Sequence, residues 1–220
     1  MARWPIAKTM QNQFSRVRIF CGWLGKPDMV ARGNGVGQFL PDVDPAAVKV
    51  KTIAEKSKSW TGNGLDAEWI IRAAMAEDFR HAAMLALGLA FGLRKMEMLL
   101  IKPWRADKSP NLEITDNVGK SGKYRQIPIE DGAFGQSQRA ALEMAKQVCK
   151  KTEHLGWPGM TLMAAENRYY YLMKRLGLTK AEMGVTGHGA RAEYAELTLL
   201  LQGGATDLGG QYQAVTHRGT

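Results

Sequence analysis

The sequence predicts a mainly α-helical chain that carries one small β-hairpin and is divided into two domains. Apolar residues recur at helical spacing along most of its 220 residues, whereas alternation is confined to two short stretches between residues 112 and 129. Residues 31–64 lack periodicity and are rich in glycine and proline, which is typical of a linker. We therefore expect a small helical domain over about residues 1–60, basic linker included, and a larger domain over about residues 65–220.

The composition is that of a globular protein with a negatively charged partner. Hydrophobic residues make up 45% of the chain and charged residues 23%, and the net charge is +9. Such an excess favours a polyanion or an acidic membrane surface. The longest apolar run, Ala82–Phe91, is too short to span a bilayer, and the N-terminus lacks the apolar core of a signal peptide. Cys21 and Cys149 are far apart and have no histidine neighbours, which favours reduced thiols in a cytoplasmic protein and predicts no metal site.

Residues 8–25 predict a basic amphipathic helix. Phe14, Val17, Phe20 and Cys21 fall on one side at helical spacing, and a Gly–Lys–Pro sequence at 25–27 should end the helix. Its polar side is either a solvated basic face or a face that lies along a phosphate backbone. The linker that follows is also rich in lysine, with the same two interpretations, and a short helix at 45–57 is possible within it.

The larger domain should begin with a helical pair that runs to about Phe91. Asp66 is a good N-cap residue, and the stretch 82–90 is apolar on nearly all sides, as expected of a central buried helix. A glycine at position 92 should end that helix, and a short helix should follow over 95–101. Arg94 would then lie just past the end of a buried helix, where Glu97 could pair with it. A purely structural ion pair and a functional arginine are equally compatible with this pattern.

Two short strands are predicted at 112–115 and 124–129, with a loop of hairpin chemistry between them. The loop presents Lys120 and Lys123. It is not a phosphate-binding P-loop, because the glycine spacing differs and no helix follows the lysine. The two lysines are either solvated or directed at a phosphate.

Further helices are expected at 136–151, 164–176, 179–183 and 187–201. In the last of them, His188 and Arg191 are three residues apart and share one face, and Tyr194, Leu197 and Leu201 continue an apolar stripe. An imidazole beside a guanidinium suits a phosphodiester, since the guanidinium can hold two oxygens and the imidazole can move one proton. The alternative is a surface arginine beside a histidine with ordinary hydrogen bonds.

Three of these motifs together resemble the tyrosine recombinases of the phage-integrase family. Gly-Leu-Arg94 with Glu97 resembles the first-arginine motif, residues 119–129 resemble the β-hairpin lysine motif, and His188-Gly-Ala-Arg191 resembles the His-x-x-Arg motif. Residues 8–30 are similar to the helical core-binding domain of integrases from mobile elements. The resemblance covers about residues 8–201, and the motifs occur in the family's order.

The resemblance implies DNA integration and recombination through a 3′-phosphotyrosine intermediate, without any cofactor. Arg94 and Arg191 would clamp the non-bridging oxygens of a phosphodiester, Lys120 would protonate the departing 5′-oxygen, and His188 would assist proton movement at the nucleophile. The partner would be double-stranded DNA, bound by a homotetramer in the cytoplasm of a prokaryotic cell. The remaining cations expected to contact DNA are Lys8, Arg16, Arg18, Lys26, Lys49, Lys51, Lys123 and Arg125.

The chain departs from the family pattern after its second arginine. Ala192 stands where the family often has a second histidine, and the family's Leu-Gly-His segment and nucleophilic tyrosine do not follow at the expected positions. We therefore expect a catalytic domain that is incomplete at its C-terminus, with Tyr212 as the remaining candidate nucleophile. Two alternatives stay open: a relative that binds DNA without cleaving it, and an unrelated helical DNA-binding regulator. The recombinase and the non-cleaving relative both predict that Arg94, Lys120, His188 and Arg191 converge on one basic pocket, whereas the regulator predicts that these residues lie apart.

Overall fold

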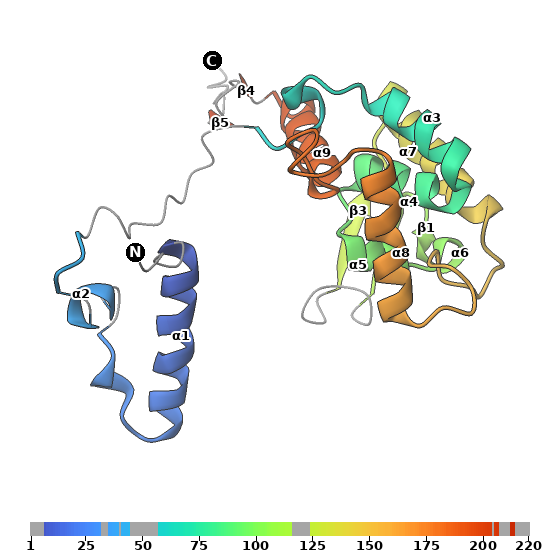
Figure 1. Ribbon diagram of the computed structural model, residues 1–220. Coiled ribbons are helices and arrows are strands. Elements are labelled where there is room, and N and C mark those ends of the chain that lie inside the picture. Colours follow the sequence, from blue (N-terminus) through green and yellow to red (C-terminus); the bar gives the residue numbers. More distant parts are fainter. Residues whose placement is uncertain are drawn as a thin grey trace, which may run out of the picture. The chain divides into compact units, whose positions relative to one another are not determined.

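The computed structural model describes residues 7–31, 35–39, 41–44, 57–115, 124–203, 205–206 and 212–213. The described chain is mainly helical, with a three-stranded and a two-stranded antiparallel sheet, which confirms the predicted fold class at this coarse level (Figure 1). Its contacts divide it into two compact units, Met1–Ala54 and Glu55–Thr220. Among the described residues, no helix combines the length and the apolar character needed to cross a membrane.

The smaller unit is built on α1 (Ala7–Trp23), with η1 (Pro27–Met29) and α2 (Gly35–Phe39) beside it. Met10, Cys21 and Val30 are buried in this unit. Phe14 packs against Met10, and the Phe14 ring stacks on Phe39 at 5.7 Å between centroids. Val17 and Phe20, which the helical spacing placed on a core-facing side, are 45% and 55% exposed, so that prediction is wrong for them. Cys21, on the same predicted apolar side, is buried near the end of α1, so burial along this helix is confined to part of that side.

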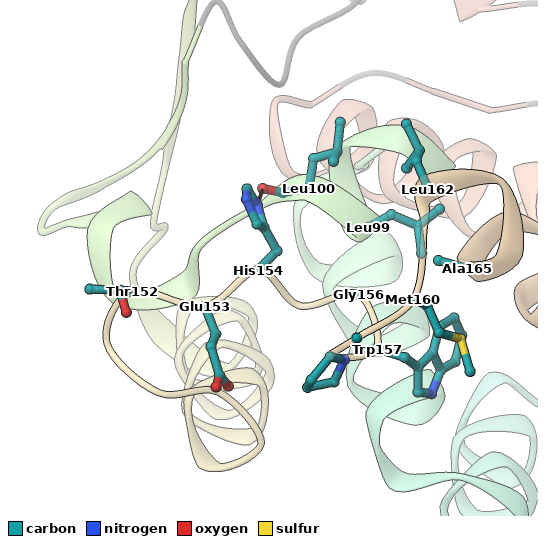
Figure 2. Close-up of a pocket in the computed structure, with 12 residues that line it drawn as sticks. Leu99, Leu100, Thr152, Glu153, His154, Gly156, Trp157, Met160, Leu162 and Ala165 are labelled. Carbon is teal, nitrogen blue, oxygen red and sulfur yellow. Dashed lines mark hydrogen bonds between the residues drawn. The ribbon is translucent and has the colours of Figure 1, made fainter.

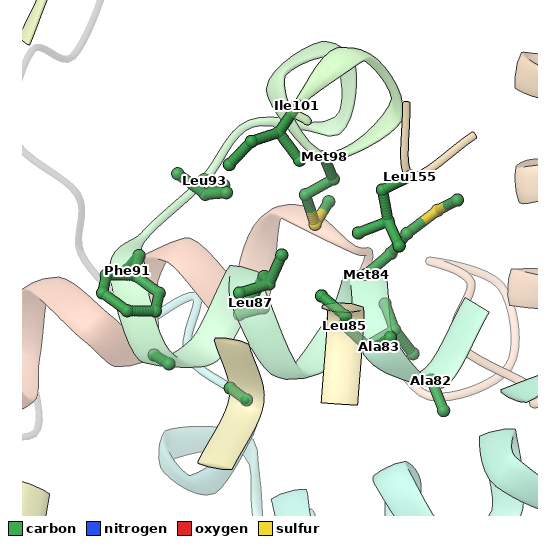
Figure 3. Packing of buried hydrophobic residues seen from close by; sticks show 14 of the residues in the cluster. Ala82, Ala83, Met84, Leu85, Leu87, Phe91, Leu93, Met98, Ile101 and Leu155 are labelled. Atoms are coloured by element: carbon green, nitrogen blue, oxygen red, sulfur yellow. The ribbon is translucent and has the colours of Figure 1, made fainter. Parts of the chain in front are cut away.

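The core of the larger unit is α4 (Phe79–Phe91), which packs against α3 (Ala67–Glu77), α7 (Gly132–Gln147) and α9 (His188–Leu201). Asp66 caps α3 as predicted, since its carboxylate accepts hydrogen bonds from the backbone of Glu68 at 2.8 Å and Trp69 at 3.1 Å. Figure 3 shows Leu87 of α4 facing Met98 across this core, and both are at most 1% exposed. The prediction of a central buried helix is therefore confirmed.

Gly92 ends α4 with a left-handed conformation, φ +59°, and the chain then forms α5 (Lys95–Leu100) and α6 (Pro103–Ala106). The sheet follows in the order β1 (Asp107–Lys108), β2 (Asn111–Ile114), β3 (Arg125–Pro128). Leu112 pairs with Ile127, and Ile114 pairs with Arg125. The two predicted strands are confirmed, whereas the intervening loop with Lys120 and Lys123 lies outside the described residues.

The remaining elements are α7 (Gly132–Gln147), α8 (Leu162–Arg175), α9 (His188–Leu201), β4 (Ala205–Thr206) and β5 (Tyr212–Gln213). The helix expected at 179–183 is a hydrogen-bonded turn instead, closed by the Met183 N–H donating to the Thr179 carbonyl at 3.1 Å. A left-handed glycine at position 184 prevents it from continuing as a helix. The stripe on α9 is also shorter than predicted, because Leu201 is 57% exposed.

Residues 57–63, which the sequence assigned to a linker, belong to the larger unit, and we call this segment the strap. The strap contains η3 (Thr61–Asn63), and its Ser59 and Trp60 are fully buried. Trp60 donates from its indole N–H to the Thr186 carbonyl at 3.1 Å, just before α9. When it is buried, the Trp60 indole needs both an apolar pocket and a hydrogen-bond acceptor for its N–H. The strap is held against the core because both are found there.

Candidate functional site

The end of α4, the start of α5 and the first turns of α9 meet at one place in the larger unit. Gly92 makes this approach possible, because a Cβ at that position would lie 2.5 Å from Cδ1 of Tyr194. The Tyr194 ring therefore rests directly on the turn between α4 and α5. One turn earlier on α9, the guanidinium of Arg191 donates to the Gly92 carbonyl. Arg191 is thus fixed to the same turn that carries Arg94.

Glu97 organises the charged side of this junction. Its carboxylate is 1% exposed and accepts from the Arg94 backbone N–H at 2.8 Å and from the Arg94 guanidinium at 2.7 Å. The Arg125 guanidinium, which comes from β3, donates to the same carboxylate at 2.5 Å. The predicted pair between Arg94 and Glu97 is confirmed. The sequence named Arg125 only as a DNA contact, and its pairing with Glu97 was missed.

Three arginines, Arg94, Arg125 and Arg191, lie at this junction beside the carboxylate of Glu97. We call them the arginine cluster. Burial is the largest cause that lowers the pKa of Arg191, followed by the charges of Arg94 and Arg125. The side chains of Arg94 and Arg125 remain 40% and 30% exposed. Glu97 neutralises one of three positive charges, so the cluster retains an excess that an anion can balance.

His188 begins α9 and adds a proton-transfer group to the arginine cluster. Burial is the largest cause that lowers the pKa of His188, followed by the charges of Arg191, Lys58 and Arg94. A histidine with a lowered pKa is neutral at pH 7, so one ring nitrogen can accept a proton. Figure 1 shows α9 beside α4 in the larger unit, and the two helices are in contact. Of the four residues predicted to converge, Arg94 and Arg191 meet at the turn around Gly92, and His188 lies one helical turn before Arg191 on α9. Lys120 lies outside the described residues, so the full convergence stays a prediction.

Two glycines set the position of His188. A Cβ at Gly189 would overlap the Trp60 indole and would lie 2.9 Å from the Lys58 carbonyl oxygen. A Cβ at Gly187 would overlap the Tyr169 hydroxyl, and the Tyr169 side chain is 2% exposed. The start of α9 is therefore packed between the strap and α8. Sequence reasoning missed the strap, although a histidine flanked by glycines on both sides was a signal that neighbouring groups approach closely.

The other predicted site residues are distributed over the rest of the chain. Lys120, Lys123, Lys49 and Lys51 lie outside the described residues. Tyr212 is the first residue of β5, where its backbone pairs with Thr206 of β4. The cations of the smaller unit are exposed, or partly exposed in the case of Arg18, along α1 and the turn after it: Lys8, Arg16, Arg18 and Lys26.

A separate pocket of about 430 Å³ lies between the end of α5, the loop before α8 and the first turns of α8. Figure 2 shows its side chains, among which His154 points to the backbone oxygen of Leu100 and Trp157 forms one wall. None of the predicted site residues lines it. Its walls are mostly apolar, so this pocket lacks the charges needed to hold a phosphate.

The chain was compared with family models, with curated proteins and with solved structures, and none of the three comparisons finds a match. Within the described residues, no group of three or more histidine, cysteine, aspartate or glutamate side chains is arranged to hold a metal ion. A function for this chain is therefore inferred from the geometry of the arginine cluster and His188.

Proposed function

We propose that this chain binds the phosphodiester backbone of duplex DNA at the arginine cluster and acts there as a tyrosine-type recombinase or integrase. The observation that carries the proposal is that Arg94 and Arg125 share the buried Glu97 carboxylate, while Arg191 and His188 approach the same turn from the start of α9, with positive charge in excess. Guanidinium forks match the paired oxygens of a phosphate, and a neutral imidazole supplies a base beside them.

In the proposed reaction, a tyrosine oxygen attacks the phosphorus and the bond to the 5′-oxygen breaks, which leaves a 3′-phosphotyrosine. Arg94 and Arg191 stabilise the charge that builds on the non-bridging oxygens, the usual largest contribution in phosphoryl transfer. His188 takes the proton of the attacking hydroxyl, and Lys120 gives a proton to the departing 5′-oxygen. Attack of a 5′-hydroxyl on the phosphotyrosine reverses these proton movements and rejoins the strand.

A second candidate is a chain that binds DNA without cutting it, and the position of Tyr194 favours it. Tyr194 lies one helical turn after Arg191 on α9, close to the arginine cluster. Its ring, however, rests on Gly92 and lies 6.2 Å from the ring of Phe134. That packing gives Tyr194 a structural role and leaves the identity of the nucleophile to Tyr212 or another tyrosine.

The test uses duplex DNA in which the scissile 5′-oxygen is replaced by sulfur, because the released thiolate does not rejoin and the covalent adduct accumulates. We expect a protein–DNA adduct on a denaturing gel for the wild-type chain. Arg191→Ala and Arg191→Lys should abolish the adduct while duplex binding weakens only modestly, because the fork acts chiefly on the transition state. Arg72→Ala is the matched control, since Arg72 pairs only with exposed Glu68 in the described structure and lies on α3.

Each outcome separates the candidates. Loss of the adduct in Tyr212→Phe identifies that residue as the nucleophile, and loss in Tyr194→Phe instead identifies Tyr194. Salt-sensitive duplex binding with no adduct in any form of the chain supports the DNA-binding candidate and refutes cleavage. A wild-type chain that binds no duplex DNA refutes both candidates.

A further inference from the structure

Two acidic side chains of α9, Glu193 and Glu196, hold the strap against that helix through hydrogen bonds. Glu196 accepts from the Ser57 hydroxyl at 2.5 Å and from the Ser59 hydroxyl at 2.7 Å. Glu193 accepts from the Thr61 backbone N–H at 3.0 Å and from the Thr61 hydroxyl at 2.5 Å. Charge-assisted bonds of this kind are short and geometrically selective. The strap therefore has one position relative to α9.

Lys58 is the one residue of the strap with a positively charged side chain, and the strap places it beside His188. Its carbonyl oxygen lies against Gly189, at 2.9 Å from where a Cβ would stand, while its side chain is exposed. The neighbouring carboxylates of Glu193 and Glu196 receive hydrogen bonds from the strap's serines and threonine. The charge of Lys58 is close enough to act on the pKa of His188, as the charge of Arg94 does. Lys58 and the arginine cluster thus approach His188 from different segments of the chain.

We infer that Lys58 is a fourth cation of the site and that it contacts a phosphate next to the one held by Arg94 and Arg191. This inference rests on the proposed function and adds to it the class of ligand. The ligand is a backbone of consecutive phosphates, contacted at two positions, and not an isolated phosphate group. The flanking phosphate contact also fixes the direction in which the strand crosses the start of α9. Lys58 is a positioning residue, because it holds the neighbour of the reacting phosphate.

The test measures duplex DNA binding by the full chain as a function of salt for the wild type, Lys58→Gln and a matched control, Lys150→Gln. The Lys150 side chain is 86% exposed, and it stands in the loop after α7. Each lysine–phosphate contact contributes about 0.9 to the slope of log K against log salt. Lys58→Gln should therefore lower the slope by about 0.9, so that wild-type affinity falls about 3.5-fold more than that of the variant between 50 and 200 mM salt. Lys150→Gln should leave the slope unchanged.

A second measurement checks the geometry without DNA. The pKa of His188, followed by NMR in the free protein, should rise in Lys58→Gln, because a nearby like charge has been removed. It should stay at the wild-type value in Lys150→Gln.

The outcomes distinguish the inference from the proposed function. If the wild type binds duplex DNA and Lys58→Gln and Lys150→Gln have the same salt slope, the role of Lys58 is refuted while DNA binding stands. An unchanged pKa of His188 in Lys58→Gln likewise overturns the placement of the lysine. If the wild type binds no duplex DNA, the proposed function and this inference fail together.

Discussion

Replacement of Glu97 by glutamine tests whether this one carboxylate holds the arginine cluster together. Both of its oxygens receive N–H donors: one from the Arg94 guanidinium, the other from the Arg94 backbone and from Arg125. Glutamine has nearly the same shape, but one of its two terminal groups is itself a donor. In Glu97→Gln at least one of these contacts therefore becomes donor against donor, and the negative charge is lost.

The expected loss of stability in Glu97→Gln follows from the burial of Glu97 and the exposure of its two arginine partners. Removing one partner of a fully buried pair costs about 3–5 kcal/mol. Here Glu97 is 1% exposed whereas the side chains of Arg94 and Arg125 are 40% and 30% exposed, so water can solvate the arginines that are left. We expect a loss of about 2–3 kcal/mol, which lowers Tm by about 5–10 °C for a unit of this size.

The assay is thermal and urea unfolding of the full chain, with Glu68→Gln as the control. Glu68 also pairs with an arginine, but both side chains are exposed, at 78% and 62%, and its removal should change stability by less than about 1 kcal/mol. A Tm for Glu97→Gln within about 2 °C of the wild type would refute the reasoning. In that case the arginines would keep their places without the carboxylate.

Two further predictions concern buried residues around the site. His81 is fully buried, its two ring nitrogens have no hydrogen-bond partner among the described residues, and burial lowers its pKa to about 4. Because the unfolded chain takes up the proton first, this histidine should make stability fall between about pH 6.5 and pH 4, by about 3 kcal/mol, and His81→Leu should remove that part of the acid sensitivity in urea unfolding. Gly189→Ala should cost about 1–3 kcal/mol, because its Cβ would overlap Trp60, and the comparison is Gly22→Ala, at a glycine of α1 where a Cβ meets nothing within 4 Å. A flat pH profile for the wild type, or an unchanged Tm in Gly189→Ala, would contradict the respective prediction.

The parts of the fold that the sequence predicted correctly are those determined within a few residues. Asp66 caps the helix that starts at the next residue, and Gly92 ends the apolar helix α4. The pair between Arg94 and Glu97 forms within one turn of helix, so spacing alone was sufficient. Capping, helix termination and i to i+3 pairing depend on local geometry, which a single sequence displays.

The parts that the sequence could not predict depend on contacts between distant segments. Arg125 reaches Glu97 only because the register of β2 and β3 brings it there. Trp60 stands in a stretch without periodicity, and its burial follows from a pocket formed by the start of α9. Leu201 has the right spacing for a core position, but no described segment covers that end of α9, so it stays exposed. Periodicity indicates which face of a helix is apolar and not how far along the helix its cover extends.

The strap also determines when the larger unit can be completed during synthesis. Its partners on α9 and in the turn before it follow by 126 to 139 residues along the chain. Ser59 and Trp60 are among the first residues of this unit to be made. Besides their local hydrogen bonds within residues 57–65, they lack their partners on α9 and in the turn before it until that helix has left the ribosome. Contacts of such separation close late and fold slowly. Arg94, Glu97 and Arg125 can pair before α9 is made, whereas Arg191 and His188 join them only with that helix. A shortened product that ends before α9 has neither the second arginine nor the histidine.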